Sequence, residues 1–120
     1  MYEYKADVYK VIDGDTVDLY IHLGFDITIK KRVRLLGIDT PEVRTRDLEE
    51  KKKGIAAKER LIELIGTKCI VRTQLDKAGK YGRILGIILG SYEFDADNNL
   101  MSCININEKL IEEGHAVPYG

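Results

Sequence analysis

Three segments near the N-terminal end alternate apolar and polar residues, and this alternation constrains the fold more than any other feature of the chain. Residues 2–12 and 15–23 are rich in β-branched residues and tyrosines, and Asp13-Gly14 between them is a strong hairpin-turn signal. Residues 27–36 alternate in the same way. The polar face of this third segment carries Thr28, Lys30, Arg32 and Arg34. The pattern therefore predicts three strands, the third with a basic face.

Two later segments have the spacing of helices. Residues 55–65 place apolar side chains on one helical face, and Gly66 is placed to end that helix. Asn105 is the predicted cap of a second helix, with Glu108 as its capping-box partner. Gly114 is the predicted end of that second helix.

Further strands are predicted at residues 68–75 and 100–104, and the all-apolar run at 84–89 predicts a strand buried on both faces. The almost wholly polar stretch 44–53 is typical of a flexible loop. Together these elements predict a β-rich α+β fold, in which a five-stranded barrel of the OB type carries two helices. The length fits a single domain over residues 1–120.

The formal net charge of −1 hides an uneven distribution of charge. The middle of the chain is basic, with +5 over residues 30–60 and +3 over residues 61–83. The ends are acidic, with −4 over residues 1–29 and −5 over residues 84–120. A basic middle region allows one face to attract polyanions, although a charge run alone is usually only a solvated surface.

Membrane proteins and disulfide scaffolds do not fit this sequence. No window approaches about 18 uninterrupted apolar residues, so we expect no transmembrane helix and no membrane partner. The first residues lack the apolar region of a signal peptide, which predicts a cytoplasmic protein unless a leader has been removed. Cys69 and Cys103 do not form a CxxC pair, so we expect two reduced, half-buried thiols, with a single disulfide as the alternative. We also expect a monomer without an obligate protein partner.

The first motif that could carry chemistry is Asp13-Gly14-Asp15-Thr16. An ordinary Asp-Gly turn would explain most of it. Asp15, however, shares the parity of the apolar row of its strand, where a carboxylate is unfavourable unless it is paired or bound to a metal. The position of Asp15 therefore indicates a site in which this carboxylate is paired or bound to a metal, in addition to a turn.

The second motif is Asp39-Thr40-Pro41-Glu42, which could be no more than a strand ending at a proline. The proline favours an extended Thr40 and so fixes the direction of its carbonyl and of the flanking carboxylates. Asp15, Asp39 and the Thr40 carbonyl would offer only oxygen ligands, which Ca²⁺ prefers, and no Cys/His cluster suggests zinc. Without the ion, two close carboxylates would repel each other, so Asp15→Asn is expected to stabilise the metal-free protein.

Two arginines stand beside apolar runs. Arg34 lies close to the second acidic motif, and Arg83 precedes the apolar strand. Either arginine could simply cap a strand edge, but an arginine held beside carboxylates can also bind a phosphate through two parallel hydrogen bonds. Lys80 and Tyr81 add a cation and an aromatic hydroxyl next to Arg83.

In order and spacing, these segments resemble the thermonuclease (staphylococcal nuclease-like) family. The resemblance rests on IDGDT at residues 12–16, VRLLGIDTPE at residues 33–42 and KYGR at residues 80–83. Gly54, followed by Ala57, matches the start of the family's helix, and the resemblance covers nearly the whole chain. It implies an OB barrel with helices.

The resemblance also implies Ca²⁺-dependent hydrolysis of phosphodiester bonds in DNA and RNA, with little sequence specificity. Ca²⁺ would be held by Asp15, Asp39 and the carbonyl of Thr40. Catalysis would fall to Glu42, as general base or water-positioning group, and to the phosphate clamp of Arg34 and Arg83. The rest of the nucleotide would be bound by Lys80, Tyr81 and Tyr119, with Asp13 supporting the metal ligands from behind.

Two other interpretations remain open. A catalytically silent OB-fold module could bind nucleic acid or a protein tail, and a plain structural domain could carry the same polar strand ends. A silent module would be expected to have lost part of the charged set, whereas this chain keeps Asp15, Arg34, Asp39, Glu42 and Arg83. We therefore expect an active Ca²⁺-dependent nuclease.

Overall fold

The computed structural model describes residues 2–75 and 84–119, and strands dominate it. The strands are β1 (Tyr2–Asp13), β2 (Thr16–Gly24), β3 (Ile27–Leu35), β4 (Ile38–Asp39), β5 (Lys68–Leu75), β6 (Ile84–Phe94), β7 (Leu100–Asn105) and β8 (Val117–Pro118). The helices are α1 (Leu48–Ile65) and α2 (Ile106–Glu112). The predicted positions 80, 81 and 83 lie outside the described residues.

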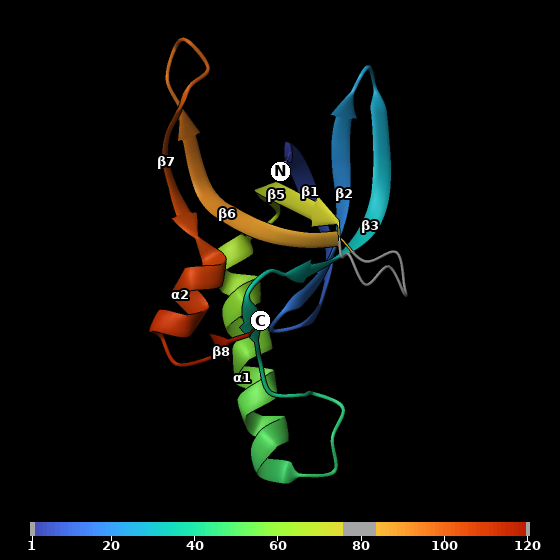
Figure 1. Ribbon diagram of the computed structural model, residues 1–120, viewed down its shortest axis with the longest axis vertical. Helices are drawn as coiled ribbons and strands as arrows, with labels where there is room; N and C mark the ends of the chain where they lie inside the picture. The colour runs from blue at the N-terminus through green and yellow to red at the C-terminus, as the bar shows by residue number, and fades with distance from the viewer. Residues whose placement is uncertain (1, 76–83, 120) are drawn as a thin grey trace.

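Five of the strands close into a ring. The main sheet has the order β3-β2-β1-β5-β6-β7, and β3 also pairs in parallel with β6 through Val33, Arg34 and Leu35. This extra pairing joins the two halves of the sheet, so the ring has the OB-type architecture that the sequence predicts. β4 and β8 form a separate two-stranded sheet below it. In Figure 1 the β2–β3 hairpin and the β6–β7 hairpin rise on opposite sides of the molecule.

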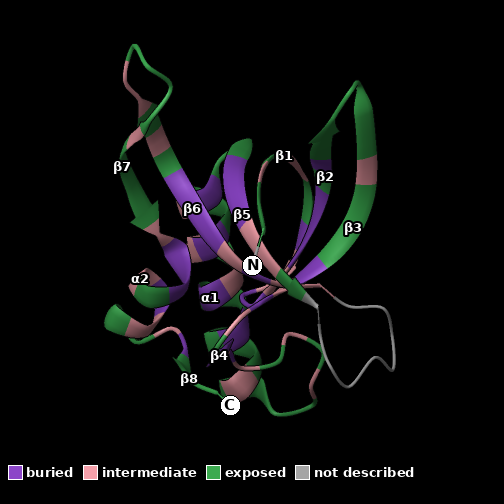
Figure 2. Cartoon of the chain, turned by 45° about the horizontal axis from the view of Figure 1, so that its top comes forward, coloured by how far each residue is buried: buried purple, intermediate pink, exposed green. Residues whose placement is uncertain are grey.

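The inside of the ring is filled by β-branched and aliphatic side chains. Val17, Leu19 and Val33 are 0% exposed, and they come from β2 and β3 at the positions that alternation predicts. Burial of each such side chain contributes about 1.5–3 kcal/mol. Figure 2 shows the buried residues along the middle of β5 and β6, whereas most of β3 away from the closure is exposed. The core therefore lies at the closed end, where β3 meets β6.

Helix α1 is longer than the sequence predicts, since it begins at Leu48 inside the expected loop. Asp47 caps it by accepting hydrogen bonds from the backbone N–H groups of Glu49 (3.0 Å) and Glu50 (3.4 Å). The added turns bury only Gly54, which has no side chain, so the apolar periodicity could not reveal them, but charged residues with long side chains are good helix formers. Gly66 ends the helix with φ of 60°, as predicted.

The second half of the chain follows the prediction apart from a longer β6 and the short strand β8, which was not predicted. Asn105 caps α2 and accepts a hydrogen bond from the N–H of Glu108 at 3.1 Å, and Gly114 follows the helix with φ of 80°. Strand β6 runs on to Phe94, five residues beyond the apolar run, and its register shifts after Gly90. The apolar pattern did not predict this extension, because that part of the strand lies outside the ring and carries polar residues.

Cys69 is buried and Cys103 is exposed, and neither forms a disulfide. The prediction of reduced thiols is therefore confirmed, whereas the expectation that both are half-buried is wrong. Burial raises the pKa of the Cys69 thiol to about 12. Neither helix found in residues 2–75 and 84–119 has the length and apolar character needed to span a membrane.

Candidate functional site

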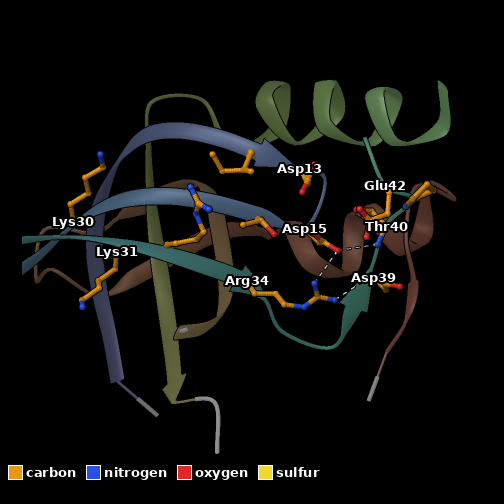
Figure 3. A pocket seen from close by; sticks show the side chains of 12 residues that line it. Asp13, Asp15, Lys30, Lys31, Arg34, Asp39, Thr40 and Glu42 are labelled. Atoms are coloured by element: carbon orange, nitrogen blue, oxygen red, sulfur yellow. Dashed lines mark hydrogen bonds and ion pairs between the residues drawn. The ribbon is translucent and has the colours of Figure 1, made fainter. Parts of the chain in front are cut away.

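A pocket of about 620 Å³ opens where the β1–β2 turn, the end of β3 and the chain after β4 come together. It is lined by Ile12, Asp13, Asp15, Thr16, Lys30, Lys31, Arg32, Arg34, Asp39, Thr40, Pro41 and Glu42. Figure 3 shows the labelled acidic side chains gathered at the end of the pocket that Arg34 enters. The structure thus brings into one cavity the predicted metal ligands, Arg34, Glu42 and Asp13.

Asp15 stands at the head of β2 and is 5% exposed, so its inward position is as predicted. Its carboxylate accepts hydrogen bonds from the Thr16 hydroxyl at 3.0 Å and from the backbone N–H of Thr40 at 3.2 Å. The second of these ties the β1–β2 turn to the chain after β4. A buried carboxylate held in this way is pre-organised, because its partners fix both of its oxygens.

Arg34 lies between the two predicted metal ligands (Figure 3). Its Nη1 is 3.5 Å from an oxygen of Asp15, and its Nη2 is 3.2 Å from an oxygen of Asp39. Nη2 also donates to the carbonyl of Ile38 at 3.4 Å. The side chain of Asp39 is 48% exposed, whereas that of Asp15 is 7% exposed. The guanidinium therefore compensates the repulsion expected between the two carboxylates.

Two glycines allow helix α1 to press directly on the site. A Cβ at Gly54 would lie 2.6 Å from the carbonyl oxygen of Glu42 and 2.7 Å from that of Pro41. A Cβ at Gly14 would lie 2.7 Å from the Cβ of Ala57. Both contacts are closer than real Cβ atoms allow, so only glycine fits. The helix consequently fixes both loops that carry the acidic residues.

Glu42 is exposed at the rim of the pocket. Its backbone N–H points to a carboxylate oxygen of Glu50 on α1 at 3.5 Å, and the other oxygen of Glu50 accepts from the hydroxyl of Thr45. The main chain at Glu42 is thereby anchored from the helix side. Its own carboxylate accepts no hydrogen bond from the described residues and is available to solvent.

Tyr119 lies beside Arg34, although it is distant in sequence. The backbone N–H of Tyr119 donates to the carbonyl of Gly37 at 2.9 Å, and β8 pairs with β4 through Val117 and Asp39. The Tyr119 ring centre lies 5.3 Å from the guanidinium carbon of Arg34, and the residue is 62% exposed. Of the predicted substrate-binding residues, Tyr119 is thus placed at the site, while Lys80 and Tyr81, like the predicted catalytic Arg83, lie outside the described residues.

Three charged lining residues were not among the predicted site residues: Lys30, Lys31 and Arg32. The basic face of the third strand was visible in the sequence, and the shared parity of Lys30, Arg32 and Arg34 was the signal that could have assigned it to the site. Arg32 forms two hydrogen bonds with Asp18, at 2.9 and 3.2 Å. These bonds hold the pKa of Asp18 below its ordinary value, although burial opposes the shift.

The possible metal ligands near Asp15 are all oxygen atoms, which is the ligand type that a hard cation prefers. Within residues 2–75 and 84–119, no group of three or more His, Cys, Asp or Glu side chains could hold a metal ion by itself. Two carboxylates and one carbonyl would leave the remaining positions of Ca²⁺ to water and phosphate. The hydroxyl of Thr40 is buried without a hydrogen-bond partner in the described part of the chain, and a bound water or ion can satisfy such a group. The donor types therefore suit Ca²⁺, but the described residues do not form a complete metal site by themselves.

Comparison with known proteins places these features in a family. The family model described as "Staphylococcal nuclease homologue" matches residues 32–120. The "Uncharacterized protein MJ1439" of Methanocaldococcus jannaschii is 30% identical over 135 aligned residues, covering 97% of this chain and 59% of that protein. "Endonuclease YhcR" of Bacillus subtilis is 27% identical over 124 residues, covering 98% of this chain and 9% of that protein. The chain spans less than two thirds of each relative's length. Because the family match extends over most of the sequence, the chain belongs to the staphylococcal nuclease homologue family.

Proposed function

We propose that the chain is a Ca²⁺-dependent phosphodiesterase that cleaves DNA and RNA in the pocket of Asp15, Arg34 and Glu42, with little sequence specificity. Family membership and a relative named as an endonuclease support this proposal. The observation that carries it is the guanidinium of Arg34, which is held between Asp15 and Asp39 inside a pocket that also contains a free carboxylate.

Arg34 acts as the phosphate clamp. Attack on a phosphodiester builds negative charge on the non-bridging oxygens, and a preorganised guanidinium stabilises that charge. The side chain is 21% exposed, so solvent screens it little, and two carboxylates already fix its direction. The guanidinium has further N–H donors, and an entering phosphate can bind to them through two parallel hydrogen bonds. Binding that reads the backbone in this way carries little base specificity.

Glu42 acts as the general base or positions the attacking water. Its carboxylate is exposed at the rim of the pocket, and its main chain is anchored by Glu50. The carboxylate accepts a proton from water as the water oxygen attacks phosphorus in line, and the 5′ oxygen leaves as its bond to phosphorus breaks and takes up a proton from solvent. Anchoring of the main chain by α1 fixes the point from which this side chain leaves the backbone at the rim of the pocket.

Ca²⁺ would be held by Asp15, Asp39 and the carbonyl of Thr40, and it would supply Lewis-acid polarisation of the phosphate. Asp13 supports these ligands from the preceding turn. Tyr119 contributes a ring beside the nucleotide. Arg83 is the proposed second arginine of the clamp. Lys80 and Tyr81 are the proposed ligands of the terminal phosphate.

The test is cleavage of plasmid and of single-stranded DNA, with Ca²⁺ or with excess chelator. We expect cleavage with Ca²⁺ and little with chelator. Glu42→Gln should remain folded and bind a nucleotide with Ca²⁺, but should cleave about 10²-fold more slowly, the range for loss of a general base.

Glu59→Gln is the matched control, because Glu59 is an exposed glutamate of α1 that does not line the pocket. It should cleave at the wild-type rate. Undiminished cleavage in chelator would remove the metal from the proposal. Binding of nucleic acid without any cleavage would instead identify the chain as a silent binding module.

A further inference from the structure

The pocket continues along the outer face of β3, away from the acidic residues. Lys30 and Arg32 share the face of Arg34, and all three line the pocket. Residues two apart on one strand are separated by about 6.6 Å, so these cations form an evenly spaced row. Figure 3 shows Lys30 at the end of the pocket opposite Asp39. The row therefore leads from the proposed catalytic end onto the open surface of the barrel.

An aromatic pair lies at the outer end of this row. Tyr20 is the cross-strand partner of Lys30, and its ring centre lies 5.5 Å from that of Tyr9, at an angle of 77°. The Nζ of Lys30 lies 3.7 Å from the centre of the Tyr9 ring. Tyr9 is 53% exposed and Tyr20 is 38% exposed, so both rings remain accessible.

The charges on this face favour a polyanion. Asp18 and Arg32 neutralise each other, and the next carboxylate outward, Asp7, accepts from the His22 ring at 2.9 Å. Lys30 forms no ion pair with any carboxylate of the described residues. Its cation is therefore free to bind an anionic ligand while it stays packed on an aromatic ring.

We propose that the face formed by Tyr9, Tyr20, Lys30 and Arg32, here called the β3 track, binds a single-stranded stretch of nucleic acid that leads away from the pocket. Lys30 binds a phosphate, Arg32 offers only the N–H donors that Asp18 does not use, and a base stacks on the tyrosine pair. A base inside a duplex is already stacked between its neighbours and cannot present its face to a ring, whereas an unpaired base can. This inference rests on the proposed function, because it names the strandedness of the substrate of the same pocket.

Binding is measured in excess chelator by fluorescence anisotropy of a labelled oligothymidylate, with a duplex of equal length as the comparison. We expect the single strand to bind more tightly than the duplex. Tyr9→Ala should weaken single-strand binding about fivefold or more, the range for loss of one stacked base. Lys30→Gln should also lower the slope of log affinity against log salt by about 0.7, because one phosphate contact is lost.

The β6–β7 hairpin supplies a control with the same chemistry. The Nζ of Lys5, on β1, lies 4.8 Å from the centre of the Phe94 ring, and the ring centres of Phe94 and Tyr92 are 5.5 Å apart, but none of the three residues lines the pocket. Tyr92→Ala and Lys5→Gln should leave single-strand affinity and its salt slope unchanged. A general attraction to cations and aromatic rings would affect both sets of variants equally, and that result would overturn the proposal.

The test separates this inference from the proposed function. If the wild-type protein cleaves but Tyr9→Ala and Lys30→Gln bind like the wild type, the β3 track is wrong and the nuclease proposal stands. If nothing is cleaved but single strands bind in a manner that depends on Tyr9 and Lys30, the track stands and catalysis is wrong. Equal binding of duplex, with the same dependence on Tyr9, would overturn the assignment to single strands.

Discussion

The contact between α1 and the site makes Gly54→Ala a sharp perturbation. The new Cβ would lie 2.6 Å from the carbonyl oxygen of Glu42, whereas ordinary contacts begin at 3.4 Å. Either the helix or the Pro41–Glu42 segment must therefore move by about 0.8 Å, the difference between these two distances. The neighbour is backbone rather than a flexible side chain, so rotamer changes cannot relieve the overlap.

Stability and activity should respond differently to this substitution. Alanine in a helix interior is favoured over glycine by about 1 kcal/mol, and overpacking of this kind costs about 1–3 kcal/mol. The free energy of unfolding should consequently fall by no more than about 2 kcal/mol, the difference between these ranges. A displacement near 1 Å at a catalytic group is worth about 10²-fold in rate, so cleavage should fall by that order.

Urea unfolding and Ca²⁺-dependent cleavage measure the two quantities on the same preparation. Ala56→Gly is the control, because Ala56 is an exposed position of the same helix. It should lose about 1 kcal/mol of stability through helix propensity alone and keep full activity. If Gly54→Ala instead gained about 1 kcal/mol and cleaved normally, α1 would not position the Pro41–Glu42 segment.

Three further predictions concern single side chains. Asp15→Asn should destabilise the metal-free protein by about 1–2 kcal/mol in urea unfolding, because charge-assisted bonds to Thr40 and Arg34 are weakened; a gain in stability would contradict the bridging role of Arg34. Because the folded-state pKa of Asp18 lies below its ordinary value of 3.8, its stabilising contribution is present above that pH and is lost as the pH falls through the lower folded value. Asp18→Asn should therefore lose less unfolding free energy than the wild type as the pH falls below 3.8. An unchanged pH dependence in this range would refute the stabilising role of the Asp18–Arg32 pair. Since the pKa of Cys69 is about 12, native protein at about pH 8 should be alkylated at the exposed Cys103 alone, as peptide mass spectrometry can check.

Much of the barrel could be predicted from the sequence, because strand alternation and caps are local signals. Asp13-Gly14 marked the first turn, and the parity of Asp15 indicated its burial in the wall of the pocket. Gly66 and Asn105 marked a helix end and a helix start in the same way. The beginning of α1 was missed because its first turns have no apolar face to set a period.

The arrangement of the charged groups depended on contacts that are distant in sequence. Two carboxylates were expected to repel each other, but the guanidinium of Arg34 lies between them once β3 and β4 fold back toward the β1–β2 turn. Tyr119 reaches Arg34 only because β8 pairs with β4. The pressure of α1 on Glu42 likewise arises from packing, and a lone glycine in a helix could not reveal it.

The most direct test of the central claim compares two arginines that each pair with a carboxylate from a strand. Arg34 meets Asp15 and Asp39 in the pocket, whereas Arg72 on β5 binds Glu3 at 2.8 Å and does not line the pocket. The measurement is the single-turnover rate of DNA cleavage with saturating Ca²⁺ for the wild type, Arg34→Lys and Arg72→Lys. Arg34→Lys should be slower by about 10²-fold, because a point charge cannot replace the bidentate fork, and Arg72→Lys should match the wild type. Arg34→Lys within a few-fold of the wild-type rate would contradict the phosphate clamp and, with it, the assignment of this pocket as the catalytic site.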